Sequence, residues 1–535
     1  MSAPIRCAPT CSPRPCGWNP APSWCRKARG SGSSSTARSP ATTRPTWRNA
    51  PIMTSDSTNP IADVVTHLDG VAPSAIVAGL PRAGERHDLP DPSTGNTFAD
   101  VAWGDVDDVH DAVRAAVAVA PEWAATSARE RAAALRAIAA ELRENSAALA
   151  DVIMMETGKR YAEAEGEVGF SAQYFEWFAD AATMPTDQHL RTGARRFLVS
   201  HQPVGVVAAV SPWNFPLSIP ARKVAPALAA GSPVVLKPSE LTPLSGLGLT
   251  QLAGRHLPGG SLNVVVGDGE KITTALVDQD SVAAVSFTGS TRVGTLVAQR
   301  AMGSMTRVTM ELGGKAPFVI CADADLDVAV EALLVAKFRN NGASCIAANN
   351  VFVHRGVYDS VLRSLADRIP ALRVGDPRDP ATELGPLLRQ SHVARLTDLV
   401  RRAEADGCRV RAGNVPEQGW YCPPTLVEAE NDTALWGEEV FGPVCVVRPY
   451  DDEDALVREV NGWRCGLGGY VMSASAEHAV ELAARLRIGI VGVNNGAPNT
   501  PEVPFGGFGF AGFGREGGLT GLHEFTEQQS IALAR

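Results

Sequence analysis

The stretch Val285-Ser286-Phe287-Thr288-Gly289-Ser290-Thr291-Arg292-Val293-Gly294 contains the transition on which the fold is built. An apolar strand ends in Gly-Ser, and a helix begins directly after it. The free N–H groups and the dipole at such a helix start favour an anion, ideally a pyrophosphate. The stretch lacks the GxGxxG spacing, so by itself it indicates a strand–turn–helix unit that suits a phosphate.

Apolar strands and helices alternate from about residue 202 to the C-terminus, which indicates an α/β fold with largely parallel sheets. Before them, residues 106–125, 127–150 and 161–182 have apolar side chains at helical spacing. These three segments predict long helices, and residues 195–201 predict a strand.

The helix expected at 161–182 carries an aromatic cluster, namely Tyr174, Phe175, Trp177 and Phe178. Such a cluster could line a substrate tunnel. Aromatic residues at helical spacing more often pack in a core, so packing is our preferred interpretation.

The composition excludes several classes of protein. The chain has 535 residues, of which 45% are hydrophobic and 20% charged, with a net charge of −9. This length suffices for two or three domains with their own cores. The mild acidic excess and the lack of a basic stripe give no case for a nucleic-acid partner. The apolar runs are short and interrupted, so we expect no membrane span and a soluble, cytoplasmic protein.

Residues 1–58 differ from the rest, with Pro, Ser, Arg and Gly around four cysteines and no acidic residue before Asp56. Such a segment predicts a disordered extension. A metal knuckle is disfavoured because the cysteines lack paired CxxC spacing and His partners. A transit peptide fits the composition but lacks an amphipathic face. We prefer a mis-assigned start, with Met53 opening the protein.

Two predicted strands end in polar segments, where open α/β sheets bind ligands. Val210-Ser211-Pro212-Trp213-Asn214-Phe215-Pro216 places Asn214 where it could donate to an oxyanion or cap the next helix. Val234-Val235-Leu236-Lys237-Pro238-Ser239-Glu240 offers Lys237 and Glu240. These two could hold the hydroxyls of an adenosine ribose, or could simply be solvated.

Two later segments carry candidate catalytic groups. In Met310-Glu311-Leu312-Gly313-Gly314-Lys315, the carboxylate of Glu311 could act as a general base or as a pairing residue. In Phe338-Arg339-Asn340-Asn341-Gly342-Ala343-Ser344-Cys345, the thiol follows a glycine-broken polar segment. This position suits a nucleophile with N–H donors beside it, while the alternative is a small buried hydrophobic residue.

Taken in order, these motifs resemble the aldehyde dehydrogenase superfamily from about residue 60 to the end. The resemblance rests on Pro212-Trp213-Asn214-Phe215-Pro216, Lys237-Pro238-Ser239-Glu240, Phe287-Thr288-Gly289-Ser290, Glu311-Leu312-Gly313-Gly314-Lys315, Cys345, Glu438-Glu439-Val440-Phe441-Gly442-Pro443 and Pro504-Phe505-Gly506-Gly507. It implies a Rossmann-type cofactor domain, an α/β catalytic domain and a small oligomerisation β-hairpin.

The resemblance also implies residue roles. Cys345 would attack an aldehyde, Asn214 would hold the oxyanion and Glu311 would activate the hydrolytic water. The expected cofactor contacts are Ser211, Trp213, Lys237, Glu240, Gly289, Ser290, Gly294, Glu439 and Phe441. Because Glu240 would face the 2′-hydroxyl, NAD is favoured over NADP, although the family uses both. No metal is expected.

The substrate prediction rests on Arg222 in Ala221-Arg222-Lys223, Arg339 in Phe338-Arg339-Asn340, and Ala348-Asn349. These segments look like the succinate-semialdehyde dehydrogenase branch, in which the two arginines would clamp a distal carboxylate. Asn499 stands where that branch has a carboxylate-binding Ser. The alternatives are structural ion pairs, a lactaldehyde or glycolaldehyde dehydrogenase, and a non-catalytic NAD-binding relative. The presence of Cys345 and Glu311 argues against the last.

The sequence also departs from the pattern of that branch. Ala343-Ser344 replaces the usual Gln-Thr, and Ala347 stands where a second Cys is common, so no disulfide switch is expected. Gly509 and Ala511 replace a common Lys and Ser. Cysteines elsewhere should be inert, reduced thiols, namely Cys321, Cys408, Cys422, Cys445 and Cys465.

For domain organisation, the resemblance implies an NAD-binding domain from 59–182 and 202–312 and a catalytic domain from 313–510. Residues 183–201 and 511–535 are the expected oligomerisation segments. A hairpin near 183–201 should pair with a strand at 525–533, whose edge a second chain can extend. We therefore expect a homodimer or homotetramer.

Overall fold

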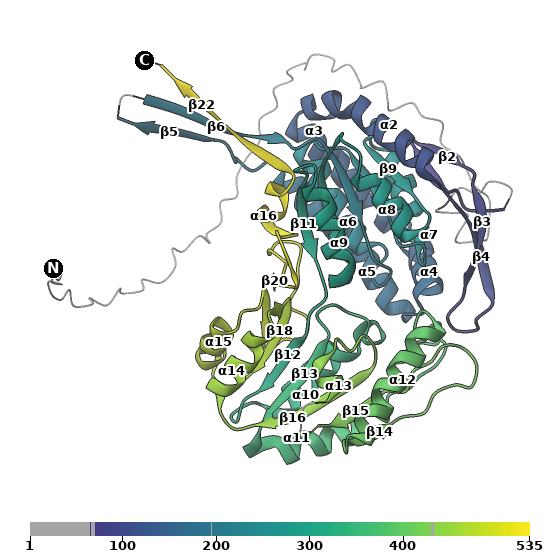
Figure 1. The fold of residues 1–535 in the computed structure, drawn as a ribbon, viewed down its shortest axis with the longest axis vertical. Coiled ribbons are helices and arrows are strands. Elements are labelled where there is room, and N and C mark those ends of the chain that lie inside the picture. The colour runs from purple at the N-terminus through teal and green to yellow at the C-terminus, as the bar shows by residue number, and fades with distance from the viewer. Residues whose placement is uncertain (1–64, 66–69, 194, 430–432, 535) are drawn as a thin grey trace, which may run out of the picture. The chain divides into compact units, whose positions relative to one another are not determined.

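The computed structural model describes residues 65, 70–193, 195–429 and 433–534 (Figure 1). The extension predicted for residues 1–58 lies outside these ranges. Within them, no helix combines the length and the apolar composition that crossing a membrane requires.

The first large sheet has eight strands, and its central part is parallel. Its order is β2 (Leu80–Arg82), β1 (Ala75–Val77), β9 (Leu262–Val265), β8 (Val234–Lys237), β7 (Val206–Val210), β10 (Val282–Thr288), β11 (Arg307–Glu311) and β21 (Gly512–Phe513). Strands β9, β8, β7, β10 and β11 run parallel, whereas β1, β2 and β21 are antiparallel to their neighbours.

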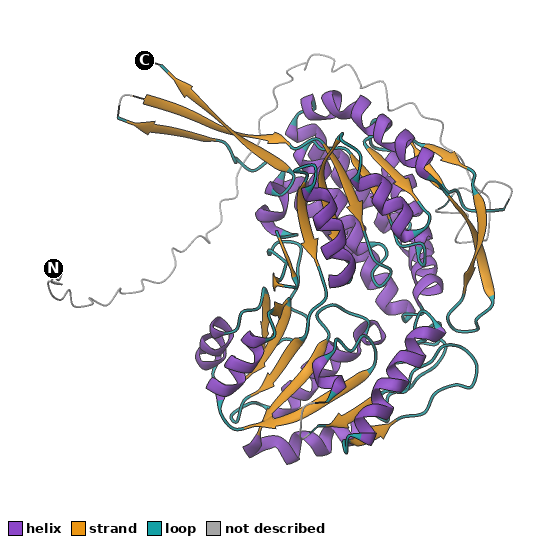
Figure 2. Cartoon of the chain, in the orientation of Figure 1, coloured by secondary structure: helices purple, strands orange, loops and turns teal. Residues whose placement is uncertain are grey.

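Alternate side chains of these strands belong to two different cores. Val207, Ala209 and Leu236 pack on one face, and Ala208, Val210 and Val235 pack on the other. Helices cover both faces, as an apolar run buried on both sides requires (Figure 2). The first face packs against α3 (Ala128–Glu144), α4 (Ser146–Thr157), α5 (Tyr161–Ala181), α6 (Ser218–Ala230) and α7 (Pro243–Gly254). The second packs against α2 (Val106–Ala125), α8 (Gly269–Val277) and α9 (Thr291–Met302).

The second large sheet has seven strands and the same layered construction. Its order is β14 (Arg409–Ala412), β15 (Thr425–Glu428), β16 (Val444–Tyr450), β13 (Ala348–His354), β12 (Ala316–Ile320), β18 (Gly468–Met472) and β19 (Ile490–Val493), all parallel except β14. One face packs against α10 (Leu326–Phe338) and α11 (Arg355–Arg368). The other packs against α12 (Gln390–Ala405), α13 (Ala434–Gly437), α14 (Glu453–Gly462) and α15 (Ala476–Arg485).

Three smaller sheets complete the fold. Strands β3 (Glu85–Pro90) and β4 (Thr97–Trp103) form a hairpin, and β17 (Cys465–Gly466) pairs with β20 (Phe508–Gly509). Strand β6 (Arg195–Pro203) lies between β5 (Gln188–Thr192) and β22 (Thr526–Leu533) in an antiparallel sheet that we call the arm. The predicted pairing of the hairpin with the C-terminal strand is therefore confirmed.

Two expected segments are divided in the structure. The helix predicted at 127–150 is interrupted at Asn145, whose side-chain amide donates to the carbonyl of Glu141 and thereby ends α3. The segment 511–535 serves two sheets, because β21 pairs with β11 and only β22 joins the arm. Between them, α16 (Gly518–His523) contacts α6.

The parallel strands bring the predicted site segments to two sheet edges. Strands β8, β7, β10 and β11 end at Lys237, Val210, Thr288 and Glu311, and neighbouring parallel strands end at the same edge. In the second sheet, the segments that contain Cys345 and Glu439 lead into the amino ends of β13 and β16. Residues 312–315 connect the two sheets directly.

Candidate active site

A left-handed turn precedes the predicted nucleophile. After α10, the short helix η2 (Arg339–Gly342) includes Asn340 and Asn341 with φ of 57° and 55°, and Gly342 has φ of 74°. Asparagine is among the residues that tolerate this conformation. A side chain at 342 would place its Cβ 2.3 Å from the carbonyl oxygen of Gly442, so only glycine fits there.

Side-chain amides hold this turn in place. Asn341 donates to the carbonyls of Gly158 and Pro386 and accepts from the N–H of Gly385. Asn340 Nδ2 lies 2.9 Å from the carbonyl oxygens of both Asn214 and Ala343. The conformation of the segment before Cys345 is therefore set by contacts with chain segments far away in sequence.

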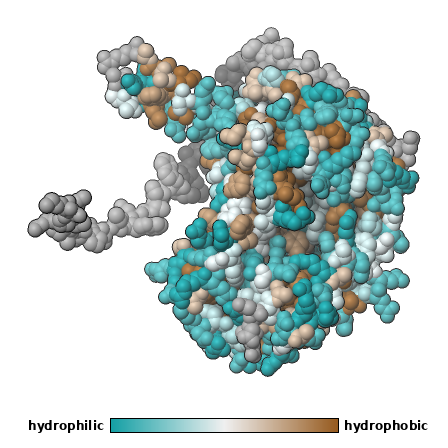
Figure 3. Space-filling view, viewed as in Figure 1, coloured by the Kyte–Doolittle hydropathy of each residue, from teal (hydrophilic) through white to brown (hydrophobic). Residues whose placement is uncertain are grey.

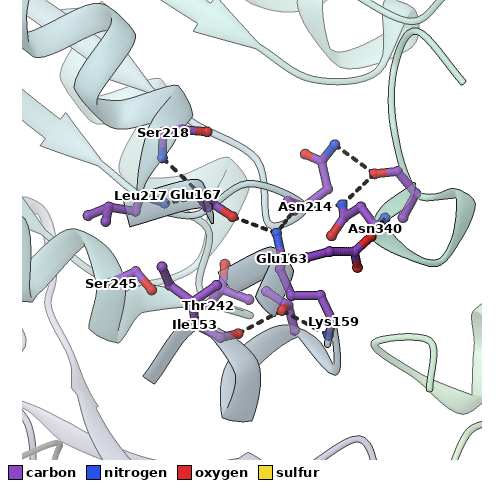
Figure 4. Close-up of polar contacts among 12 residues, drawn as sticks. Ile153, Lys159, Glu163, Glu167, Asn214, Leu217, Ser218, Thr242, Ser245 and Asn340 are labelled. Carbon is purple, nitrogen blue, oxygen red and sulfur yellow. Dashed lines mark hydrogen bonds and ion pairs between the residues drawn. The ribbon is translucent and has the colours of Figure 1, made fainter. Parts of the chain in front are cut away.

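Asn214, the predicted oxyanion donor, lies against the same segment. Its Nδ2 donates to the carbonyl of Ala343 at 3.1 Å, and Figure 4 shows Asn214 and Asn340 directed at this one oxygen from different elements. An amide nitrogen carries two protons, so one remains for another acceptor. The structure thus brings Asn214 beside the loop that carries Cys345.

A buried ion pair that the sequence analysis missed anchors the loop of Asn214. Lys159 Nζ lies 2.5 Å from Glu167 Oε2 and donates to the carbonyl of Asn214 at 2.9 Å (Figure 4). Glu167 Oε1 accepts from the N–H groups of Leu217 and Ser218 at the start of α6. The sequence signal was only a Gly-Lys pair between two helices, which does not identify partners.

A cavity of about 330 Å³ is lined in part by Cys345. We call it the Cys345 cavity. Its lining includes all three predicted substrate residues, namely Arg222, Arg339 and Asn499, and also Tyr174, Phe170 and Phe505. The structure therefore brings the predicted carboxylate clamp and the predicted nucleophile to one space, together with an aromatic residue that we had assigned to the core.

Arg222 is already paired in this structure. Its Nε forms an ion pair with Glu516, and its guanidinium lies 4.5 Å from the ring centre of Phe505. Lys223 Nζ binds the other oxygen of Glu516 at 2.6 Å. Burial would raise the pKa of Glu516, but the charges of Arg222 and Lys223 hold it below its ordinary value. By contrast, Arg339 has no carboxylate within ion-pair distance in the part of the chain that is described.

Glu311, the predicted base, ends β11 and is 2% exposed. Neither of its carboxylate oxygens has a hydrogen-bond partner among the residues described. A Cβ at Gly506 would lie 2.7 Å from its Oε1, so glycine makes room for this carboxylate. Burial, followed by the charge of Glu516, raises the pKa of Glu311 well above its ordinary value.

The thiol of Cys345 is partly buried among Ile346, Leu467 and Phe505. Burial raises its pKa to about 12; Arg222 opposes the shift, while Glu311 and Glu439 add to it. The thiol is therefore protonated at neutral pH in the free protein, and a base must remove its proton before it can attack.

The predicted cofactor residues of the first sheet gather at one edge. Lys237 Nζ lies 2.8 Å from Glu240 Oε2. Gly289 is followed by Ser290, whose hydroxyl caps α9, and Gly294 lets α9 approach the side chain of Leu312. The hydroxyls of Ser211 and Thr288, at the ends of β7 and β10, are buried without a partner in the described structure. A polar ligand above this edge would satisfy them.

The remaining cofactor residues lie at the junction of the two sheets. Glu439 Oε1 accepts weakly from the N–H of Gly314, at 3.4 Å. The ring of Phe441 meets Trp213 edge-on, with ring centres 5.5 Å apart, and Trp213 also contacts His392. The predicted cofactor residues therefore follow the carboxyl ends of β7, β8 and β10 or lie where the two sheets meet, and their carboxylates, hydroxyls and helix N–H groups are of the kinds that bind a dinucleotide.

The model of the aldehyde dehydrogenase family matches residues 80–531. The chain belongs to this family. A probable NADP-dependent succinate-semialdehyde dehydrogenase from Sinorhizobium fredii is 38% identical, over 84% of this chain and 93% of its own. A glutarate-semialdehyde dehydrogenase from Pseudomonas putida is 36% identical, over 84% of this chain and 95% of its own.

The fold agrees with this membership. A solved succinate-semialdehyde dehydrogenase from Burkholderia pseudomallei superposes with a TM-score of 0.85 at 36% identity, covering 88% of this chain and all of that one. The predicted aldehyde dehydrogenase fold and NAD(P)-dependent aldehyde dehydrogenase class are confirmed.

Proposed function

We propose that this aldehyde dehydrogenase oxidises a carboxylated semialdehyde, such as succinate semialdehyde, to the corresponding dicarboxylate. The observation that carries the proposal is that Arg339, Arg222 and Asn499 line the cavity that ends at Cys345. A guanidinium binds a planar carboxylate with two parallel hydrogen bonds. The similarity to succinate- and glutarate-semialdehyde dehydrogenases supports the same substrate class.

In this proposal, Glu311 first takes the proton of the Cys345 thiol and passes it to solvent, and the thiolate then attacks the aldehyde carbon to form a thiohemiacetal. The N–H of Asn214 that Ala343 does not use stabilises the oxyanion, together with the backbone N–H of Cys345. A nicotinamide held near Glu439 and Phe441 would supply the hydride acceptor, and loss of the hydride from the thiohemiacetal would leave a thioester on Cys345. Glu311 then takes a proton from the water that hydrolyses this thioester, and the thiolate is released with the acid.

We further propose NAD as the preferred cofactor. Lys237 and Glu240 form a bonded pair after β8, where they would hold the adenosine ribose. The carboxylate of Glu240 would repel a 2′-phosphate. Initial rates with NAD and with NADP at saturating aldehyde test this cofactor preference. Glu240→Gln should reduce the ratio of the rate with NAD to the rate with NADP. A wild-type enzyme that favours NADP would contradict the cofactor proposal.

The arm supports a homodimer or homotetramer as the working form. Its outer strands, β5 and β22, each have one edge that no described strand covers. Figure 3 shows hydrophobic side chains gathered on the arm, and Leu190, Ile531 and Leu533 are exposed there. An uncovered edge with apolar side chains is suited to extension by a second chain.

Initial rates of NADH formation with an aldehyde panel test the substrate proposal. The panel contains succinate and glutarate semialdehydes and the neutral lactaldehyde, glycolaldehyde and benzaldehyde. Cys345→Ala should abolish turnover of all of them. Arg339→Met should lower kcat/KM for the semialdehydes by about 10²-fold, because a buried charge-assisted bond is lost, and should spare neutral aldehydes.

Arg222→Met is a weaker test, because it also leaves Glu516 with one cation fewer. Its melting temperature must therefore be compared with that of the wild type. If the wild type prefers lactaldehyde or glycolaldehyde, and Arg339→Met leaves kcat/KM unchanged for every aldehyde, a short hydroxyaldehyde replaces the semialdehyde as the proposed substrate.

A further inference from the structure

Tyr174 carries a hydroxyl proton that the fold itself does not use. The residue lies on α5 and is 1% exposed; the guanidinium of Arg222 can only donate to its hydroxyl, and no described residue accepts the hydroxyl proton. It nevertheless lines the Cys345 cavity together with Arg222 and Arg339. A buried hydroxyl at the wall of a cavity can be satisfied by what enters the cavity.

The packing of the Tyr174 ring does not require the hydroxyl. The ring meets Phe170 edge-on, with ring centres 5.1 Å apart, and stacks near Phe178 at 6.5 Å. Burying a hydroxyl proton without an acceptor costs stability, a cost that phenylalanine would avoid. An acceptor on a bound ligand would offset that cost.

The positive charge of Arg222 beside the Tyr174 hydroxyl favours a negatively charged ligand. The guanidinium of Arg222 interacts with the Tyr174 hydroxyl, and burial raises the pKa of Tyr174 to about 12 against the effect of Arg222. The hydroxyl is thus neutral at pH 7 and can donate. Because Nε of Arg222 is paired with Glu516, fewer of its N–H groups remain for a ligand carboxylate. A second donor beside the guanidinium would therefore strengthen the binding of such a carboxylate.

We propose that the Tyr174 hydroxyl donates to the distal carboxylate of the substrate and determines the preference for acidic over neutral aldehydes. This inference rests on the proposed function, since it requires a carboxylated substrate. The donor would act next to Arg222 on the carboxylate, a group that does not react, so it contributes to binding more than to turnover.

The test compares Tyr174→Phe with a matched control, Tyr450→Phe. Tyr450 ends β16 and is 7% exposed, and its hydroxyl lies beside the thiol of Cys321 and not in the lining of the Cys345 cavity. Each variant is assayed with succinate semialdehyde and with butanal, which has the same carbon chain without the carboxylate. Inhibition by succinate and the melting temperature are measured in parallel.

For Tyr174→Phe, we expect KM for succinate semialdehyde and the inhibition constant of succinate to rise by about 10-fold. The kcat for this substrate and the KM for butanal should change less than twofold, and the melting temperature should not fall. Tyr450→Phe should leave every kinetic constant unchanged.

Three outcomes would overturn the inference. If the wild type favours succinate semialdehyde over butanal and Tyr174→Phe keeps that preference, the hydroxyl does not bind the carboxylate, although the proposed function stands. A lower melting temperature with unchanged kinetics would assign Tyr174 a purely structural role. If the wild type does not favour succinate semialdehyde over butanal, both the proposed function and this inference are wrong.

Discussion

At the scale of single residues, burial controls the carboxyl groups around the site. Glu439 is partly buried where the two sheets meet, with the N–H of Gly314 as a distant donor. Burial raises its pKa to about 7, against that donor and the charges of Arg395 and Lys337. Between its ordinary value of 4.5 and about 7, the folded chain keeps a proton that the unfolded chain releases. This group therefore lowers stability as the pH rises through that window.

Glu439→Gln should remove this pH dependence, because an amide stays neutral. At pH 4, below that window, Glu439 is mostly protonated in both the folded and the unfolded wild type, so variant and wild type should have nearly the same free energy of unfolding. At pH 8.5, the variant should be more stable by up to about 3 kcal/mol. Urea unfolding at both pH values measures the difference. Glu438→Gln, at an exposed neighbouring position, is the control, and an equal pH trend in that variant would contradict the assignment to Glu439.

At the scale of elements, one set of hydrogen bonds joins three segments. The start of α5 supplies Glu167, the loop before α6 supplies Asn214, and the turn after α10 supplies Asn340. Lys159, just before α5, connects the first two, since it binds both Glu167 and the carbonyl of Asn214. We infer that Lys159 positions the Asn214 loop for the reaction at Cys345.

Lys159→Met should destabilise the protein by about 3–5 kcal/mol, because it leaves the buried Glu167 without its cation. Adding Glu167→Gln removes that charge and should restore much of the lost stability. The kcat should stay low in both variants, since the Asn214 carbonyl loses its lysine donor in each. Unfolding curves and kcat are measured together, and recovery of kcat in the double variant would show that Lys159 has only a structural role.

At the scale of the whole molecule, the arm is the part that lacks a packed core of its own. Its side chains are exposed along most of β5 and β22, unlike the strands of the two large sheets. A three-stranded sheet without helices on its faces gains little from burial within one chain. Its apolar side chains are better explained by contact with a second copy.

Ile531→Asp should therefore lower the molar mass in solution or weaken the association of subunits. Ile531 is 42% exposed on β22. The control is Val480→Asp, which places the same charge at an exposed apolar position on α15, far along the chain from the arm. Light scattering after size-exclusion chromatography gives the mass. A wild type that is monomeric, or equal losses in both variants, would refute the role of the arm.

The sequence by itself determined the classes of elements and the catalytic candidates. Apolar periodicity predicted α2 at Val106–Ala125 and the strand–turn–helix unit at β10 and α9, because these patterns depend on neighbours a few residues apart. The order of several motifs indicates the family and, with it, Cys345, Arg222 and Arg339 as site residues, and these three line one cavity.

Only the tertiary structure shows which residues form ion pairs and hydrogen bonds with the site residues. Arg222 pairs with Glu516, and the Asn214 loop binds Lys159, although no local pattern connects these residues. Tyr174 fits a core by its helical spacing, yet it lines the cavity, and its hydroxyl proton has no acceptor among the described residues. Periodicity depends on neighbours a few residues apart, so it predicts which face of a helix is buried. Which residues that face contacts depends on how distant strands and helices are placed in the fold, and the sequence pattern does not contain this information.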